Sequence, residues 1–134
     1  MSATLQGRRI VIPESRELDL FATMLEERGA ATLRCPLVAI HDAADPGPVI
    51  AWLQRFAAGA DDLVLLTGEG LRRLMAAAAR AGLAEAVTAR LATVRKITRG
   101  PKPARALREL GLKTDLAAEV PTTDGIVALL QPLD

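Results

Sequence analysis

The chain has 134 residues, of which 17 are basic and 16 acidic, and half of its side chains are apolar. This length fits one domain, and the high apolar content with almost balanced charge excludes a disordered chain. No apolar run reaches the roughly 18 residues of a membrane helix, no signal-peptide core lies near the N-terminus, and the single cysteine cannot form an internal disulfide, so we expect a cytoplasmic protein.

The first 40 residues carry the pattern of a strand, a helix and a second strand. Ile10–Ile12 is a short apolar run typical of a buried strand. Apolar residues recur at helical spacing over residues 17–28, and Gly29 is the expected end of that helix. Residues 32–40 resemble a second strand, which Pro36 places at a sheet edge or bends because proline lacks an N–H donor.

The remaining chain alternates helical and strand patterns. Helices are predicted over residues 49–57, 71–82, 85–92, 104–110 and 126–130, and strands over residues 62–67, 93–97 and 115–120. The strand at residues 62–67 is the most apolar, so we expect it at the centre of a sheet. Five βα units in succession predict an α/β fold with a parallel five-stranded flavodoxin-like sheet, strand order 2-1-3-4-5, and helices on both faces.

Ligands of open parallel sheets bind beyond the carboxyl ends of the strands. Four loops occupy that position here, at residues 13–16, 67–70, 98–103 and 121–125. Each places small or hydroxylated residues at the start of a helix, where free backbone N–H groups favour anions. Ordinary helix capping is the alternative interpretation of each loop taken alone.

Positive charge is concentrated around the third of these loops. Six basic residues and no acid fall within 14 positions: Arg95, Lys96, Arg99, Lys102, Arg105 and Arg108. This excess suits a ligand that carries carboxylates or phosphates, although a solvated strand edge and helix face would have the same composition. We expect no nucleic-acid partner, because no binding motif is present and the chain has only three aromatic residues for base stacking.

Several kinds of catalytic site are excluded by composition. His41 and Cys35 are each the only residue of their type, so no metal site is expected, and Cys35 is predicted to be a small buried residue. The chain contains no nucleophile elbow with a partner histidine, no Walker loop and no GxGxxG motif. The third strand ends in Thr67 rather than in the aspartate that a phosphate-accepting receiver domain would need.

The stretch KITRGPKPARALRELGL at residues 96–112 resembles the G-x-x-T-A-x-A-L-x-x-x-G-L signature of uroporphyrinogen-III synthases. Residues 118–125 follow at the family's spacing and resemble its A-E-x-P-T segment. The likeness covers nearly the whole chain but only about the first half of the family's length. The chain departs from the pattern at Thr67-Gly68, where the family has Thr-Ser, at Pro103, where it has Thr, and in having no tyrosine.

The resemblance implies a family fold of two α/β domains joined by two crossing strands, the first domain being split in sequence. Residues 1–40 would then be a crossing βαβ segment, with the first βα unit separated from the rest, and residues 41–134 a βα-repeat domain. The exposed apolar face of such a segment would favour a homodimer.

The implied activity is closure of hydroxymethylbilane to uroporphyrinogen III, with inversion of the last pyrrole ring and loss of water, in heme and cobalamin biosynthesis. No metal or organic cofactor is implied, the partner is a small molecule with eight carboxylates, and no membrane is involved. The catalytic residues are unknown, since no general acid can be named from the sequence. The expected substrate-binding residues are Arg16, Thr67, Gly68, Arg99, Gly100, Lys102 and Thr122.

Two other interpretations remain open. The missing hydroxyls and the missing half favour a non-catalytic regulatory module of the same fold that binds a tetrapyrrole or another polyanion. A purely structural α/β domain is the third.

Overall fold

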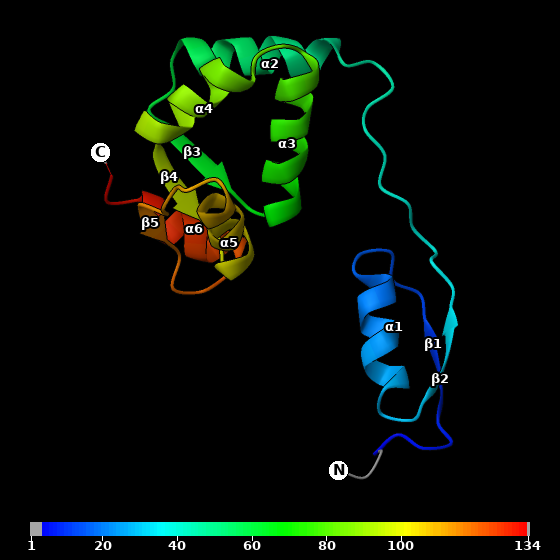
Figure 1. Ribbon diagram of the computed structural model, residues 1–134. Coiled ribbons are helices and arrows are strands. Elements are labelled where there is room, and N and C mark those ends of the chain that lie inside the picture. Colours follow the sequence, from blue (N-terminus) through cyan, green and yellow to red (C-terminus); the bar gives the residue numbers. More distant parts are fainter. Residues whose placement is uncertain (1–3, 134) are drawn as a thin grey trace. The chain divides into compact units, whose positions relative to one another are not determined.

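The computed structural model describes residues 4–133, which form two units that divide between Asp42 and Ala43. The first unit consists of β1 (Arg9–Ile12), α1 (Leu18–Glu26) and β2 (Ala31–Arg34) (Figure 1). The two strands are parallel, and Arg9 is paired with Ala31. The turn between α1 and β2 uses Gly29 at a φ of 92°, a conformation that glycine adopts without strain.

The first unit buries few apolar side chains. Ile12, Ala22 and Ala30 are its buried apolar residues among those described. The strand predicted over residues 32–40 is shorter than expected, since β2 ends at Arg34. Cys35 is exposed, so the prediction that it is buried is wrong. Its surroundings are exposed as well, since β2 itself contains no buried residue.

The second unit holds a parallel three-stranded sheet and five helices (Figure 1). The strands lie in the order β3 (Asp62–Leu65), β4 (Arg95–Thr98) and β5 (Leu116–Ala117). The helices are α2 (Gly47–Ala58), α3 (Gly68–Arg80), α4 (Ala84–Thr93), α5 (Pro101–Glu109) and α6 (Thr123–Leu130). The predicted α/β fold with parallel strands is confirmed.

The predicted five-stranded sheet is wrong, because β1 and β2 pair with each other and form a sheet of their own. The strand expected at the centre, β3, lies at an edge of the second sheet within the described residues, and β4 is central. Burial agrees with this order: Leu63 and Leu65 of β3 are buried on one face, whereas Lys96, Ile97 and Thr98 are buried in succession. A strand with neighbours on both edges and helices on its faces exposes little.

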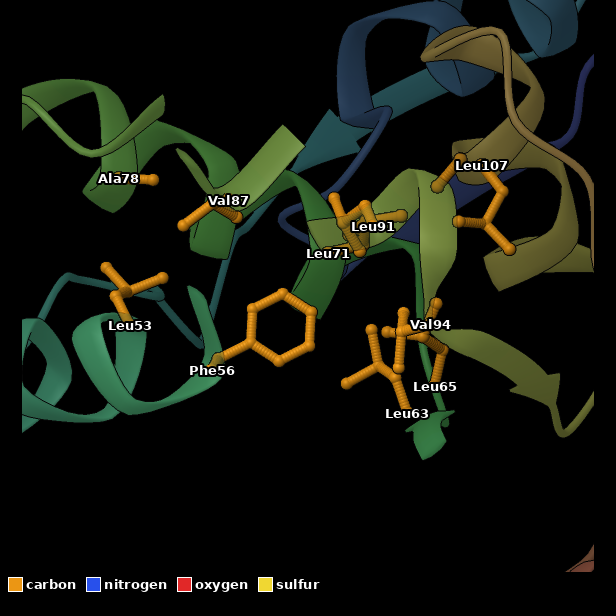
Figure 2. Packing of buried hydrophobic residues seen from close by; sticks show 11 residues of the cluster. Leu53, Phe56, Leu63, Leu65, Leu71, Ala78, Val87, Leu91, Val94 and Leu107 are labelled. Carbon is orange, nitrogen blue, oxygen red and sulfur yellow. The ribbon is translucent and has the colours of Figure 1, made fainter. Parts of the chain in front are cut away.

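The core of the second unit lies between the sheet and α2–α5 (Figure 2). Phe56 from α2, Leu71 from α3, Leu91 from α4 and Leu107 from α5 meet Leu65 of β3 in one cluster. Each of the four helical residues lies on the buried face of its own helix. The cluster therefore fixes the sheet and α5, the helix that follows the carboxyl end of β4.

The helix α5 begins at Pro101, three residues earlier than the sequence pattern predicts. Proline is tolerated in the first turn of a helix, since the N–H groups there have no partner within the helix. Gly68 at the start of α3 packs closely against this turn: a Cβ at Gly68 would lie 2.8 Å from the Lys102 carbonyl oxygen. No helix in the described part of the chain is both long and apolar enough to cross a membrane.

Candidate functional site

A groove of about 590 Å³ lies beside α5 in the second unit. We call it the α5–β5 groove. Its lining residues come from the carboxyl end of β4, from α5, and from β5 with the loops on either side of it: Thr98, Gly100, Pro101, Ala104, Arg108, Lys113, Thr114, Ala117, Ala118, Glu119 and Pro121. The groove thus reaches the carboxyl ends of β4 and β5, where ligands of parallel sheets bind.

The polar lining of the α5–β5 groove combines hydroxyl groups with positive charge. Thr98 is fully buried, and its hydroxyl donates to the Thr114 hydroxyl at 3.4 Å. Arg108 and Lys113 are the basic lining residues, and Glu119 is the acidic one. The lining therefore carries a net positive charge, which favours an anionic ligand.

Ion pairs engage half of the basic cluster predicted from the sequence. Arg95 is paired with Asp62, Lys96 with Asp115 and Arg105 with Glu109. The guanidinium of Arg95 holds the pKa of Asp62 below its usual range.

Glu109 also accepts two hydrogen bonds from Arg72 of α3, each 3.0 Å long, and these lower its pKa. By contrast, the side chains of Arg99, Lys102, Arg108 and Lys113 have no hydrogen-bond or ion-pair partner within residues 4–133. Within the basic cluster and the groove lining, the charge available to a ligand therefore comes from these four side chains.

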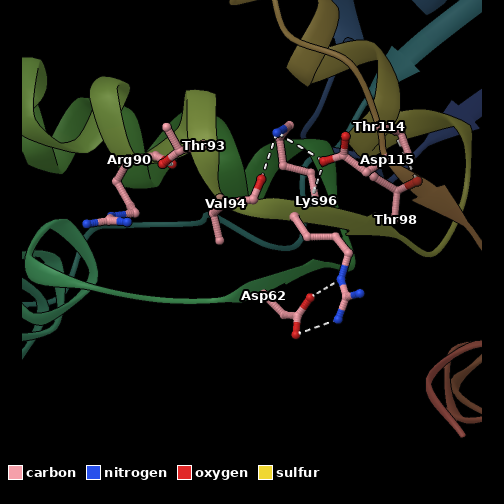
Figure 3. A network of polar contacts seen from close by, with 9 residues as sticks. Asp62, Arg90, Thr93, Val94, Lys96, Thr98, Thr114 and Asp115 are labelled. Atoms are coloured by element: carbon pink, nitrogen blue, oxygen red, sulfur yellow. Dashed lines mark hydrogen bonds and ion pairs between the residues drawn. The ribbon is translucent and has the colours of Figure 1, made fainter. Parts of the chain in front are cut away.

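The contact between Lys96 and Asp115 joins β4 to the wall of the groove (Figure 3). One carboxylate oxygen of Asp115 accepts the Lys96 backbone N–H at 2.7 Å and lies 3.1 Å from Lys96 Nζ. The Asp115 N–H donates to the Lys96 carbonyl at 2.9 Å, and Nζ also donates to the Val94 carbonyl at 2.8 Å. The Lys96 backbone N–H, followed by its ammonium, lowers the pKa of Asp115.

Gly100 lines the α5–β5 groove, and Arg99 and Lys102 flank it in the chain without lining it. Thr67 and Thr122 each cap a helix: their hydroxyl oxygens accept the N–H of Gly70 at 2.9 Å and of Gly125 at 3.1 Å. Each hydroxyl keeps its own proton for donation to a ligand.

Gly100 is the one predicted site residue that lines the groove, and the other six, Gly68 and Arg16 included, do not. Gly68 is buried against the turn at Lys102 and serves the packing of α3 on α5. Arg16 belongs to the first unit, between β1 and α1, and its side chain is exposed.

The sequence analysis missed Lys113, Thr114 and Glu119 as groove residues. They lie outside the loop at residues 98–103, on the approach to β5 and after it, and their spacing carries no signal of its own. No group of three potential metal ligands occurs within residues 4–133.

Comparisons with known proteins agree with the architecture. The family model described as "Uroporphyrinogen-III synthase HemD" matches residues 19–134. The "Uncharacterized protein YjjA" of Bacillus subtilis (strain 168) is 30% identical over 135 residues, which cover 100% of this chain and 50% of that protein.

Solved structures of uroporphyrinogen III synthase from Thermus thermophilus are similar as well. The structure of a mutant of that protein is 28% identical with a TM-score of 0.68, over 95% of this chain and 47% of that one. A second structure is 30% identical with a TM-score of 0.54, over 95% and 48% of the two chains. The chain therefore spans about half the length of the relatives it matches.

Proposed function

The chain belongs to the uroporphyrinogen-III synthase family, and we propose that it takes part in closing hydroxymethylbilane to uroporphyrinogen III, with inversion of the last pyrrole ring and loss of water. The reaction would serve heme and cobalamin biosynthesis in the cytoplasm. The proposed ligand is a small polycarboxylate, and its proposed binding site includes the carboxyl ends of β4 and β5.

The observation that carries this proposal is the α5–β5 groove with unpaired cations in and beside it. Arg99 and Lys102 are free of ion pairs within the described residues and sit where β4 passes into α5. A substrate with eight carboxylates needs several such groups, and guanidinium and ammonium groups bind carboxylates directly.

The chain's own residues would act mainly by holding a flexible linear substrate in one conformation. Fixing the two reacting ends of a chain near each other turns a rare encounter into a frequent one, which lowers the barrier without a covalent intermediate. Gly100 would let the substrate approach the backbone, and the Thr67 and Thr122 hydroxyls would donate to carboxylates. Arg16, Arg99 and Lys102 would supply charge. No general acid is assigned.

A non-catalytic binding module is the second candidate function. Its support is the start of α5, where Pro101 and Pro103 replace two backbone donors. Such a module would bind the tetrapyrrole without closing the ring.

A coupled assay with freshly prepared hydroxymethylbilane separates the two candidates. Formation of uroporphyrinogen III above the uncatalysed background, by this chain or by a longer version of it, is the result expected of a synthase. If both are inactive and yet bind uroporphyrinogen III, the binding module is the correct function. Lys102→Glu should weaken that binding, because it replaces an attractive charge with a repulsive one.

We also propose that two copies associate through the first unit. This unit buries only three described apolar residues, while its large exposed apolar side chains are Val11, Leu20, Phe21, Met24, Leu33, Leu37, Val38 and Ile40. A unit of about 40 residues with so small a core is rarely stable alone. Light scattering should give twice the 14.2 kDa chain mass. Leu33→Lys should give the mass of the monomer. If the unaltered chain is a monomer at all concentrations, the proposed dimer is wrong.

A further inference from the structure

The two ends of α5 differ in what they offer to an anion. At its start, Pro101 and Pro103 have no N–H group, so two of the first four helical positions cannot donate. A helix start normally binds anions through those free donors. The opposite end of α5 carries Arg108, which lines the groove together with Lys113. Positive charge therefore enters the groove from side chains at the far end of the helix.

The charges of Arg108 and Lys113 are not neutralised by ion pairs with neighbouring residues. Neither side chain has a hydrogen-bond or ion-pair partner in the described part of the chain. The nearest acid on the helix, Glu109, is engaged by Arg72 and Arg105. The groove lining itself holds one carboxylate, that of Glu119, so one positive charge is left uncompensated.

The backbone that presents Lys113 is held in place. Asp115, two residues further along, is tied to β4 by its own N–H to the Lys96 carbonyl at 2.9 Å and by its carboxylate to the Lys96 N–H at 2.7 Å. Thr114 accepts from the buried Thr98 hydroxyl. A cation on a fixed backbone loses less conformational entropy on binding than one on a mobile loop.

We propose that Arg108 and Lys113 together bind one carboxylate of the ligand at the end of the α5–β5 groove remote from Gly100. This site rests on the proposed function for the identity of the ligand, a polycarboxylate tetrapyrrole. The Arg108–Lys113 site adds a carboxylate contact that lies outside the loops at the carboxyl ends of the strands. Arg108 presents a planar fork that matches a carboxylate, and Lys113 adds a second charge.

The test is anaerobic titration of the whole chain with uroporphyrinogen III. Arg108→Gln and Lys113→Gln should each raise Kd about tenfold, and the effect should shrink at 1 M salt, because exposed charges are screened. Arg55→Gln is the matched control: Arg55 lies on α2, lines no part of the groove, and its side chain has no partner among the described residues, so Kd should not change. Circular dichroism confirms that each variant is folded.

A Lys102→Gln variant distinguishes failure of this inference from failure of the proposed function. If Lys102→Gln weakens binding while Arg108→Gln and Lys113→Gln match Arg55→Gln, the remote site does not exist and the strand-end site stands. If the unaltered chain does not bind uroporphyrinogen III, both the Arg108–Lys113 site and the proposed function are wrong. A tenfold loss in each groove variant, with none in the control, supports the site.

Discussion

The Asp115 carboxylate accepts a hydrogen bond from the backbone N–H of Lys96 in β4. We predict that Asp115→Ala lowers the free energy of unfolding by about 2–3 kcal/mol. Lys96 is only 5% exposed. Alanine would leave its backbone N–H without the acceptor now at 2.7 Å and its ammonium with the Val94 carbonyl alone. An unsatisfied buried donor costs about 1–3 kcal/mol and a broken buried ion pair about 3–5 kcal/mol. Because the Asp115 side chain is 46% exposed, we take the lower part of that combined range.

Urea denaturation followed by Trp52 fluorescence measures this effect in the second unit. Trp52 is the single tryptophan of the chain, lies on α2 and stacks on Phe56 with ring centres 5.3 Å apart. Asp115→Asn keeps an oxygen for the Lys96 N–H and loses only the charge, so we expect it to cost about 1 kcal/mol. If alanine costs under about 0.5 kcal/mol, or if asparagine and alanine cost the same, the reasoning about this contact is refuted.

The same contact gives stability a defined dependence on pH. The pKa of Asp115 is lower in the folded chain than in the unfolded one, because the Lys96 N–H and ammonium stabilise the carboxylate. The unfolded state therefore binds the proton first as pH falls. The stabilisation is complete above the unfolded pKa of about 4 and is lost as pH falls through the folded pKa. The stability difference between the unaltered chain and Asp115→Asn should stay constant above about pH 5 and shrink below about pH 4.

Two glycines allow steric predictions that the same urea experiment can check. Gly68→Ala should destabilise the second unit by about 1–3 kcal/mol, because the added Cβ would lie 2.8 Å from the Lys102 carbonyl oxygen. Gly59→Ala is the control: nothing lies within 4 Å of its Cβ, so the free energy of unfolding should change by under about 0.5 kcal/mol. In Gly125→Ala the added Cβ would clash with the Val120 carbonyl oxygen, so the start of α6 must shift, and we expect a loss of at least about 2 kcal/mol. Equal stability of the Gly68 and Gly59 variants, or a neutral Gly125 variant, would contradict this packing.

Helix positions were predictable from the sequence because apolar spacing and glycine stops act locally. Strand extent was harder to predict. Apolar residues continue past Arg34, yet β2 ends there and Leu37 is 74% exposed. A strand needs a surface to pack against as well as apolar side chains. The apolar run at residues 62–67 indicated a central strand, but two of its residues face the core and Val64 does not. Which strands share a sheet depends on contacts distant in sequence, and the periodicity does not encode them.

In the candidate site, too, local features could be predicted from the sequence and contacts between distant residues could not. Gly100 and the basic residues near it could be identified from the chain, because composition marks a local excess of charge. The sequence could not show which of these cations are unpaired, because their partners are distant along the chain. Arg95 pairs with Asp62, 33 residues earlier, and Glu109 pairs with Arg72 across 37 residues. Lys113 joins the groove only because β5 lies beside β4.

Filling the α5–β5 groove tests most directly whether it is the ligand site. Ala104 lines the groove from α5, whereas Ala76 is exposed on α3 and lines no part of it. We expect the unaltered chain and Ala76→Trp to bind uroporphyrinogen III with the same Kd, and Ala104→Trp to lose that binding while its unfolding midpoint shows that it is folded. Undiminished binding by folded Ala104→Trp would show that the ligand lies elsewhere.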